Sequence, residues 1–305
     1  MKRRRHIASP VATVALLAGL ATGGPSAAAD QLAFSVPNPL GAVQNRRVAL
    51  DYAIYIGGFR MIDIALKARL DRADYRIGMD LKAVGFLNTI IDWEMTAWSE
   101  GSFESRRVVP VRAGHNSEWR GKHRRIRLDW SRGDGPPVVE TVPKGGGDER
   151  SIVKEQDRIG VRDLAGAILS TLISVGIKDS CTHAEPVFDG RRRFDMKFEE
   201  VGRDRLEKTD FSPYEGEALR CSLEIERISG FRLRQSRYRW MSGGNRATVW
   251  LGRALPDAPP VLMRLEVETV FGPLRLHLVK AALDNGGVTL PAQQSKFHGK
   301  SGNSD

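Results

Sequence analysis

The sequence predicts a mainly β protein: a strongly curved antiparallel sheet, an open or half barrel, that wraps one amphipathic helix. Apolar and polar residues alternate in many short segments, which is typical of strands with one buried face. Turns rich in glycine, proline and aspartate separate these segments, and only one segment has helical spacing. A sheet of about ten or more strands accumulates twist, so it curls or splits.

The opening of the chain predicts an antiparallel meander. Apolar residues occupy one face of segment 48–56, and Gly57-Gly58 then marks a hairpin turn. The alternation continues through 59–70 and, after a turn at 71–74, through 75–83. Further alternating segments follow, at 125–130, 194–199, 223–227, 262–270 and 274–283, with glycine- and proline-rich loops at 131–137, 143–148 and 256–260.

One segment has the spacing of a helix rather than a strand. Its apolar stripe comprises Leu164, Ala165, Ile168, Leu169, Leu172 and Ile173. Asp163 is suited to cap its start, and Gly176 lies near its end. Such a stripe has to be buried, so we expect the helix to lie against one face of the sheet, where it can plug the mouth of the curl.

The first 29 residues have the layout of a secretory signal peptide. A basic head, 1–5, precedes a short apolar run, 11–21, and Ala27-Ala28-Ala29 provides a cleavage site before Asp30. The alternative is a disordered basic tail. We therefore expect a signal peptide at 1–29, an N-terminal extension at 30–44, one curved β-sheet domain at 45–285 and a disordered tail at 286–305. This layout predicts a periplasmic protein without a transmembrane anchor after cleavage.

The charge of the chain narrows the class of partner. The net charge is +10, and loss of the four basic residues of the leader would lower it to +6. Nucleic acid, the usual partner of a basic protein, is not expected outside the cytoplasm. Lipid head groups and other anionic envelope polymers are the available polyanions, although a basic surface can also be merely well solvated.

The two cysteines, Cys181 and Cys221, are expected to form a disulfide. An oxidising compartment allows such a pair to persist, and closing the loop between them would stabilise the fold by roughly 3–4 kcal/mol. A reactive thiol or a metal site is the rival interpretation, but neither cysteine belongs to a CxxC motif or a ligand-spaced pattern with histidine.

No known catalytic motif is present. The chain contains no HExxH, no GxSxG, no glycine-rich phosphate loop and no zinc pattern of cysteine and histidine. His115 and His123 lie in a very basic region, and His277 has the pattern of a structural strand residue. Most acidic residues stand on the polar faces of strands beside basic ones, so ion pairing accounts for them. We expect no enzyme activity, no metal and no cofactor.

The strongest local signal is the segment Val187 to Asp195. Asp189-Gly190 predicts a tight hairpin turn, because glycine supplies the positive φ that such turns need. Arg191, Arg192 and Arg193 leave this turn with their guanidiniums divided between the two faces of the strand. They can bind the anionic head of a ligand at the mouth of a cavity, or they can pair with Asp189, Asp195 or Glu185.

This turn, together with the two cysteines, Tyr214-x-Gly216 and the opening 52–58, resembles the bacterial family catalogued as domain of unknown function 3108. The resemblance covers roughly residues 45–285. It implies an exported envelope protein whose fold is similar to that of the periplasmic lipoprotein carriers, in which a curved sheet and an apolar helix form a hydrophobic cavity. It implies no catalytic residues.

Three hypotheses for function follow. The first is a non-enzymatic periplasmic envelope protein that binds an amphipathic or lipid-like ligand in a concave apolar cavity, with the anionic head near Arg191, Arg192 or Arg193. The second is an interaction module that supports the envelope by contacting another envelope protein through an open sheet edge. Alternating basic strand residues can also provide the contact, and they are Arg232, Arg234, Arg237 and Arg239. The third is a hydrolase with scattered carboxylates. Six tryptophans in strand-like segments can either line a cavity or fill the core, and they are Trp93, Trp98, Trp119, Trp130, Trp240 and Trp250.

Overall fold

The structure is a computed structural model. It describes residues 46–131, 135–143, 150–232, 246–254, 259–269 and 272–284. The predicted signal peptide, N-terminal extension and C-terminal tail lie outside these ranges, and so does Trp240. Those predictions stay predictions.

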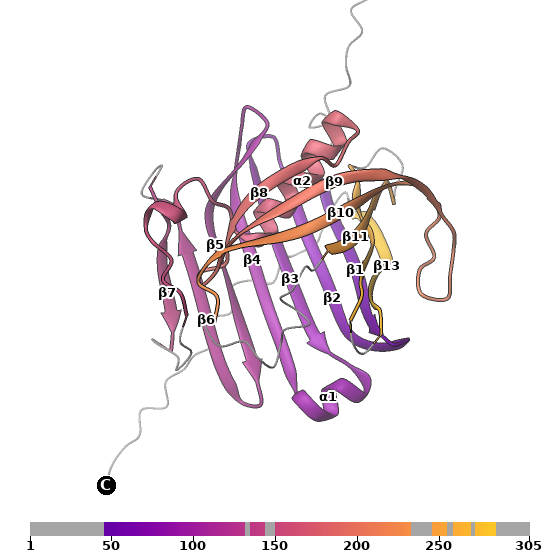
Figure 1. The fold of residues 1–305 in the computed structure, drawn as a ribbon, viewed down its shortest axis with the longest axis horizontal. Helices are drawn as coiled ribbons and strands as arrows, with labels where there is room; N and C mark the ends of the chain where they lie inside the picture. Colours follow the sequence, from indigo (N-terminus) through magenta and orange to yellow (C-terminus); the bar gives the residue numbers. More distant parts are fainter. Residues whose placement is uncertain are drawn as a thin grey trace, which may run out of the picture. The chain divides into compact units, whose positions relative to one another are not determined.

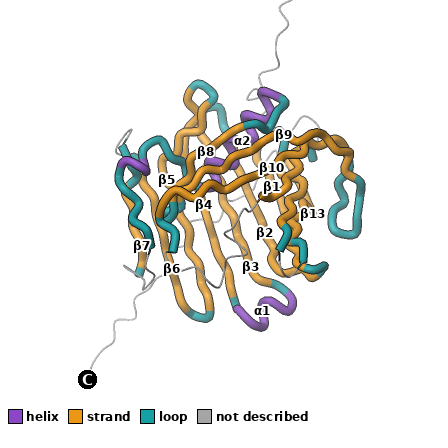
Figure 2. Tube along the Cα trace, viewed as in Figure 1, coloured by secondary structure: helices purple, strands orange, loops and turns teal. Residues whose placement is uncertain are grey.

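Within the described residues, thirteen strands form one antiparallel sheet (Figure 1). The first seven, in chain order, are β1 (Arg46–Ile56), β2 (Phe59–Leu70), β3 (Asp74–Ala83), β4 (Trp93–Glu104), β5 (Arg107–Trp119), β6 (Lys122–Asp129) and β7 (Val138–Val142). The other six are β8 (His183–Phe188), β9 (Arg193–Leu206), β10 (Gly216–Ser229), β11 (Arg246–Gly252), β12 (Val261–Val267) and β13 (Leu274–Asp284). The described residues also form two α-helices, α1 (Gly85–Ile91) and α2 (Leu164–Lys178), and the 3-10 helix η2 (Gln156–Arg158). Figure 2 shows the helices and strands in different colours.

The sheet consists of two meanders joined along β1 and β13. Its order is β7-β6-β5-β4-β3-β2-β1-β13-β12-β11-β10-β9-β8. The predicted opening meander is confirmed: Ile64 of β2 lies opposite Tyr52 of β1 and Leu81 of β3. Residues in such a row share one face, so the alternation of the sequence becomes an apolar face and a polar face.

Helix α2 packs against both meanders. Ala165 and Leu169 belong to a core cluster with residues of β1, β2 and β3. Ala167 and Val175 belong to a second cluster with residues of β8 to β11. One helix can contact both meanders only if the sheet curves around it, so the predicted curved sheet with a packed amphipathic helix is confirmed. We call the face that carries α2 the inner face and the opposite one the outer face.

The ends of α2 agree with the sequence prediction, and so does its predicted stripe apart from one residue. Ala165 and Leu169 are buried, and the half-buried Ile168, Leu172 and Ile173 pack against the core. The Asp163 carboxylate caps the helix by accepting hydrogen bonds from the backbone N–H groups of Ala165 (3.0 Å) and Gly166 (3.1 Å). Leu164, predicted to be in the stripe, is exposed. Small residues take its place, because the sheet approaches the helix too closely for a long side chain; a Cβ on Gly166 would lie 3.2 Å from the Tyr75 hydroxyl.

The two edges of the sheet approach each other without pairing. The segment before α2 lies along the edge of β8, where the backbone of Arg162 exchanges hydrogen bonds with Pro186 and Phe188 (both 2.9 Å). The β8–β9 turn lies against β6, since a Cβ on Gly190 would come within 2.3 Å of Ile126 Cγ2. Among the described strands β7 and β8 form no ladder, so the sheet is not closed into a barrel.

Helix α1 was not expected, because its sequence, GFLNTII, is short and has no side-chain cap. It connects β3 to β4 and has no buried residue.

Candidate functional site

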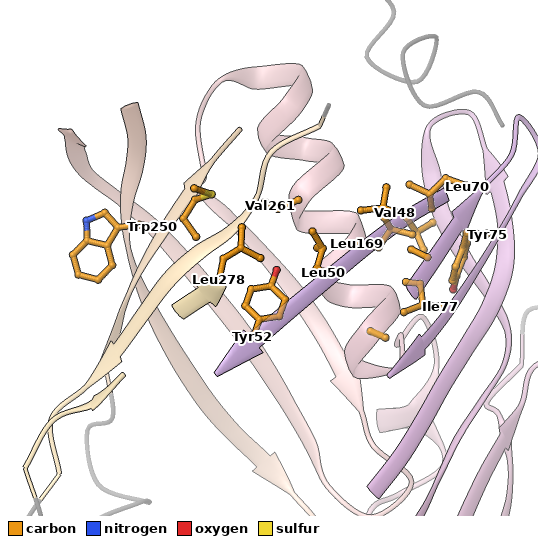
Figure 3. Packing of buried hydrophobic residues seen from close by; sticks show 14 of the residues in the cluster. Val48, Leu50, Tyr52, Leu70, Tyr75, Ile77, Leu169, Trp250, Val261 and Leu278 are labelled. Atoms are coloured by element: carbon orange, nitrogen blue, oxygen red, sulfur yellow. The ribbon is translucent and has the colours of Figure 1, made fainter. Parts of the chain in front are cut away.

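The inner face is covered unevenly by α2. The helix contacts β8, β5 and β4, and beneath it Tyr75 and Val108 are at most 1% exposed. Figure 3 shows Val48, Leu70 and Ile77 gathered beside the helix that carries Leu169. We call this region the closed half of the inner face.

Beyond the helix, the same strands present apolar side chains that stay half-buried. Ladder pairing aligns Tyr52, Ile64, Leu81 and Met95 in one row across four strands. A neighbouring row contains Leu276, Ile54 and Ile62. We call the half-buried residues of these rows, together with Met79 and Trp93, the open half: Ile54, Ile62, Ile64, Met79, Leu81, Trp93, Met95 and Leu276.

The rows of the open half end at a group of cations. In the ladder, Ser117 follows Met95 and Arg124 follows Ser117, so the Arg124 side chain lies on the inner face. The next row runs from Met79 through Ala97 to His115. An apolar band thus leads across the inner face to polar and basic residues on β5 and β6.

The predicted arginine turn lies beside this group. Burial lowers the pKa of His115; Asp189 acts against this shift, and the guanidiniums of Arg124, Arg192 and Arg191 add to it. The geometry agrees, since Gly190 of the turn lies against Ile126, which is opposite His115 in the β5–β6 ladder. We call Arg124, Arg191 and Arg192 the basic corner.

Aspartates in and next to the turn hold its arginines in place. Asp189 accepts hydrogen bonds from the backbone N–H groups of Arg191 (3.0 Å) and Arg192 (2.7 Å), and its carboxylate pairs with the Arg192 guanidinium. Arg193 pairs with Asp195 at 2.5 Å and donates to the Asp157 carbonyl. The predicted hairpin is present, with Gly190 at φ +89° in a loop of four residues, 189–192. Arg192 is half-exposed and remains suited to a ligand, whereas Arg193 is mostly buried in a structural pair.

The predicted disulfide is confirmed. Cys181, which follows α2, is bonded to Cys221 of β10, and both residues are fully buried. The bond ties the end of the helix to the second meander.

The outer face has a shallow depression of about 510 Å³ across β1 to β4. Four carboxylates line it, and two of them are engaged: Asp63 pairs with Arg60 at 2.6 Å, and Asp80 accepts from Thr96 at 3.0 Å. No group of three or more histidine, cysteine or acidic side chains suited to a metal ion occurs in the part of the chain that the structure describes. No helix within the described ranges is long and apolar enough to cross a membrane.

Comparison with protein families identifies the chain's relatives. The model of a family described as "Protein of unknown function (DUF3108)" matches residues 51–279. The chain belongs to this family. A search of curated proteins finds no match. Among solved structures, the DUF3108 chain is similar to the "Beta-barrel-like Protein of Domain of Unknown Function DUF1849 from Brucella abortus", with 9% identity and a TM-score of 0.46 over 80% of this chain and 100% of the other.

Sequence reasoning did not predict the partners of two buried carboxylates in this DUF3108 member. Glu185 is 2% exposed and contacts Arg162 Nη1 at 2.5 Å and His183 Nε2 at 2.6 Å. Burial acts to raise the pKa of Glu185, but the hydrogen bonds of His183 and Ser170 and the charge of Arg162 hold it below its ordinary value. An alternating strand places Glu185 on the face of Val187, which was a signal that it points inward.

The second buried carboxylate, Asp163, was predicted only as a helix cap. It also accepts a hydrogen bond from the Ser99 hydroxyl (2.9 Å), which in turn lies 3.3 Å from the Tyr75 hydroxyl. Burial raises the pKa of Asp163 despite these hydrogen bonds. Both carboxylates therefore hold the segment before α2 between β4, β5 and β8.

Proposed function

We propose that this DUF3108 member is a non-enzymatic periplasmic envelope protein that binds an amphipathic, lipid-like ligand. The open half of the inner face would hold the apolar body, and the basic corner would hold the anionic head. The observation that carries this proposal is the half-buried apolar band that leads to Arg124, Arg191 and Arg192.

The chemistry of the band supports an acyl chain as the apolar body. Isoleucine, leucine and methionine side chains provide contact without a specific hydrogen bond, and methionine adapts to irregular partners. Arginine favours the other end of such a ligand, because its guanidinium binds carboxylate or phosphate through two parallel hydrogen bonds. Apolar contact would supply affinity, and the basic corner would set the orientation.

Two further features support a periplasmic protein without catalytic activity. A buried disulfide persists in oxidising compartments, which agrees with the predicted signal peptide. The two buried carboxylates have structural roles, since Asp163 caps α2 and Glu185 is neutralised by Arg162. The hydrolase hypothesis would need one of them to face a substrate.

The test is lipid analysis of the purified protein. Protein isolated from its bacterial envelope should carry lipid that organic extraction and mass spectrometry detect, and delipidated protein should take up a fluorescent fatty acid. Protein that carries no lipid and takes up no fatty acid would contradict the proposal.

A matched pair of variants locates the binding. Leu81→Asn places an amide in the open half and should weaken fatty-acid uptake, whereas Lys82→Asn changes the next residue, on the outer face, and should not. Equal loss in both variants would argue against the inner face.

The alternative is an interaction module for another envelope protein. Strand β7 favours it, because β7 has one neighbour among the described strands and exposes Val138 and Val142. Of the basic strand residues considered for this role, Arg232 is described, and Arg234, Arg237 and Arg239 lie outside the described residues. Crosslinking in envelope extracts, repeated with Val138→Lys, would detect such a partner.

A further inference from the structure

Large hydrophobic side chains are exposed at one end of the sheet. Phe59 is 73% exposed, Phe86 71%, Trp119 54% and Ile90 44%. They come from the β1–β2 hairpin, from α1 and from the end of β5. We call these four residues the apolar end.

Contacts between these segments place them side by side. Helix α1 contacts β2 and β3, and a Cβ on Gly85, at its start, would lie 3.3 Å from the Arg60 carbonyl oxygen. At the other end of α1, the Ile90 carbonyl accepts hydrogen bonds from the guanidinium of Arg120 at 3.2 and 2.5 Å. Arg120 directly follows Trp119, so the β1–β2 hairpin, α1 and the end of β5 lie at the same end of the sheet (Figure 1, around the α1 label).

Core packing does not account for α1. The helix has no buried residue, although four of its seven residues are Phe86, Leu87, Ile90 and Ile91. An exposed apolar patch of this kind in a soluble protein usually marks an interaction surface.

The same end carries cations. Lys122 lies opposite Trp119 in the β5–β6 ladder, and Arg124 lies opposite Ser117, so both are on the face that carries Trp119. Within the described part of the chain, neither cation forms an ion pair. Arg120 adds a third positive charge from the same hairpin.

Aromatic and aliphatic side chains among unpaired cations suit the surface of an anionic bilayer. Tryptophan favours the head-group region, phenylalanine and isoleucine reach the acyl boundary, and lysine and arginine are attracted to anionic lipid. The apolar end is also continuous with the inner face, because Phe59 pairs with Ile56 and Trp119 pairs with Trp93.

We propose that the apolar end docks on the surface of a lipid bilayer that contains anionic phospholipid. Docking brings the open half of the inner face to the membrane, but it does not depend on ligand binding. The proposed partner of the apolar end is therefore a lipid bilayer. The test below distinguishes it from a protein partner.

The test is co-flotation with vesicles of phosphatidylcholine, with and without phosphatidylglycerol, using the chain as it is isolated from the bacterial envelope. The protein should float with the anionic vesicles. Phe86→Ser combined with Trp119→Ser should lower the bound fraction by about tenfold, because both side chains leave the acyl boundary. Ile152→Ser is the matched control and should bind as the parent does. Ile152 is 84% exposed, and the preceding Ser151 accepts a hydrogen bond from Gly230, which follows β10, so this segment does not belong to the apolar end.

The charge contribution is tested by Lys122→Gln combined with Arg124→Gln. This variant should lose the preference for phosphatidylglycerol and keep its melting temperature. Absence of co-flotation of the parent, or equal loss in the Ile152→Ser control, would overturn the proposal. So would full binding by the Phe86→Ser, Trp119→Ser variant, which would show that this surface serves another partner.

A second measurement, fluorescence quenching by brominated lipids, does not depend on whether the serine variants fold. Lipids brominated near the head group should quench part of the parent's fluorescence, and Trp119→Phe should remove that part; unchanged quenching would contradict docking at this end. Fatty-acid uptake measured without vesicles should persist in the Phe86→Ser variant. Failure of uptake with intact vesicle binding would reject the proposed function alone.

Discussion

Beneath α2, Tyr75 and Val108 are almost completely buried, whereas Met79 and Leu81, on the same strand as Tyr75, stay half-buried. The two halves have the same alternation and the same antiparallel ladders. They differ in what covers them, since α2 covers the closed half and does not reach the open half. The position of α2 on the curved sheet thus determines which parts of the strands are buried in the core and which stay half-buried.

The largest expected effect is on the network that fixes α2 over the closed half. Arg162→Leu leaves Glu185 buried without its guanidinium and should lower the free energy of unfolding by about 3–5 kcal/mol. Urea unfolding followed by circular dichroism measures it. Arg203→Leu, which removes an exposed pair with Asp179, should cause no measurable change. Similar small changes in both variants would show that Arg162 does not hold the closed half together.

The comparison itself is tested by matched truncations. Leu169→Ala in α2 should lower the free energy of unfolding by about 2–5 kcal/mol, because it leaves a cavity beneath the helix that neighbouring side chains do not fill. Leu81→Ala in the open half should cost less than about half as much, since less buried area is lost. Equal losses in urea unfolding would mean that the open half is packed as a core.

The disulfide should contribute about 2–4 kcal/mol by tying the end of α2 to β10. Cys181→Ser should lower the melting temperature in oxidising buffer, and a reductant should destabilise the parent but not the variant. Free-thiol titration of denatured, unreduced protein checks the bond directly, and two reactive thiols there would refute it.

The pH dependence of stability tests whether His277, on the outer face, is buried in its neutral form. Burial and, to a smaller extent, the charges of Arg264 and Arg275 lower its pKa from 6.5 to about 4, while Glu266 acts in the opposite direction. Between these two pKa values, His277 binds a proton in the unfolded chain but stays neutral in the folded protein. The free energy of unfolding therefore falls by roughly 2–3 kcal/mol as the pH drops from about 6.5 towards 4. His277→Gln should flatten this part of the pH profile, and the exposed His123→Gln should not. Parallel profiles for both variants would contradict a buried neutral His277.

The smallest stability effect is expected at the basic corner. Arg192→Gln should change the free energy of unfolding by about 0.5 kcal/mol, because the side chain is half-exposed, and it should weaken fatty-acid binding. Arg193→Gln removes the partner of Asp195 and should act mainly on stability. Unchanged binding in Arg192→Gln would leave that arginine as part of a solvated turn.

Much of the fold could be predicted from the sequence because its signals are local. Alternation predicted the strands of the opening meander, and Asp163 marked the first turn of α2. The disulfide followed from two cysteines and an expected oxidising compartment. These inferences need only neighbouring residues, or two cysteines with no third cysteine to compete as a partner.

The rest depends on contacts between distant segments. Nothing near Glu185 in the sequence indicates that its partner is Arg162 rather than the three arginines that follow the turn. Only Leu164 was wrongly assigned to the α2 stripe, because closeness to Tyr75 selects glycine and alanine over leucine at the start of the helix. The division of the inner face into a closed and an open half requires the position of α2 on the sheet, which no local pattern contains.

The most direct test of the open half uses two tryptophans on one strand. Trp93 lies on the inner face of β4, and Trp98 lies on the outer face, opposite Gly78 and Gly114. A brominated fatty acid bound in the open half should quench the parent's fluorescence, Trp93→Phe should remove much of that quenching, and Trp98→Phe should preserve it. Quenching that is unchanged in Trp93→Phe, or that disappears in Trp98→Phe, would contradict an acyl chain bound on the inner face.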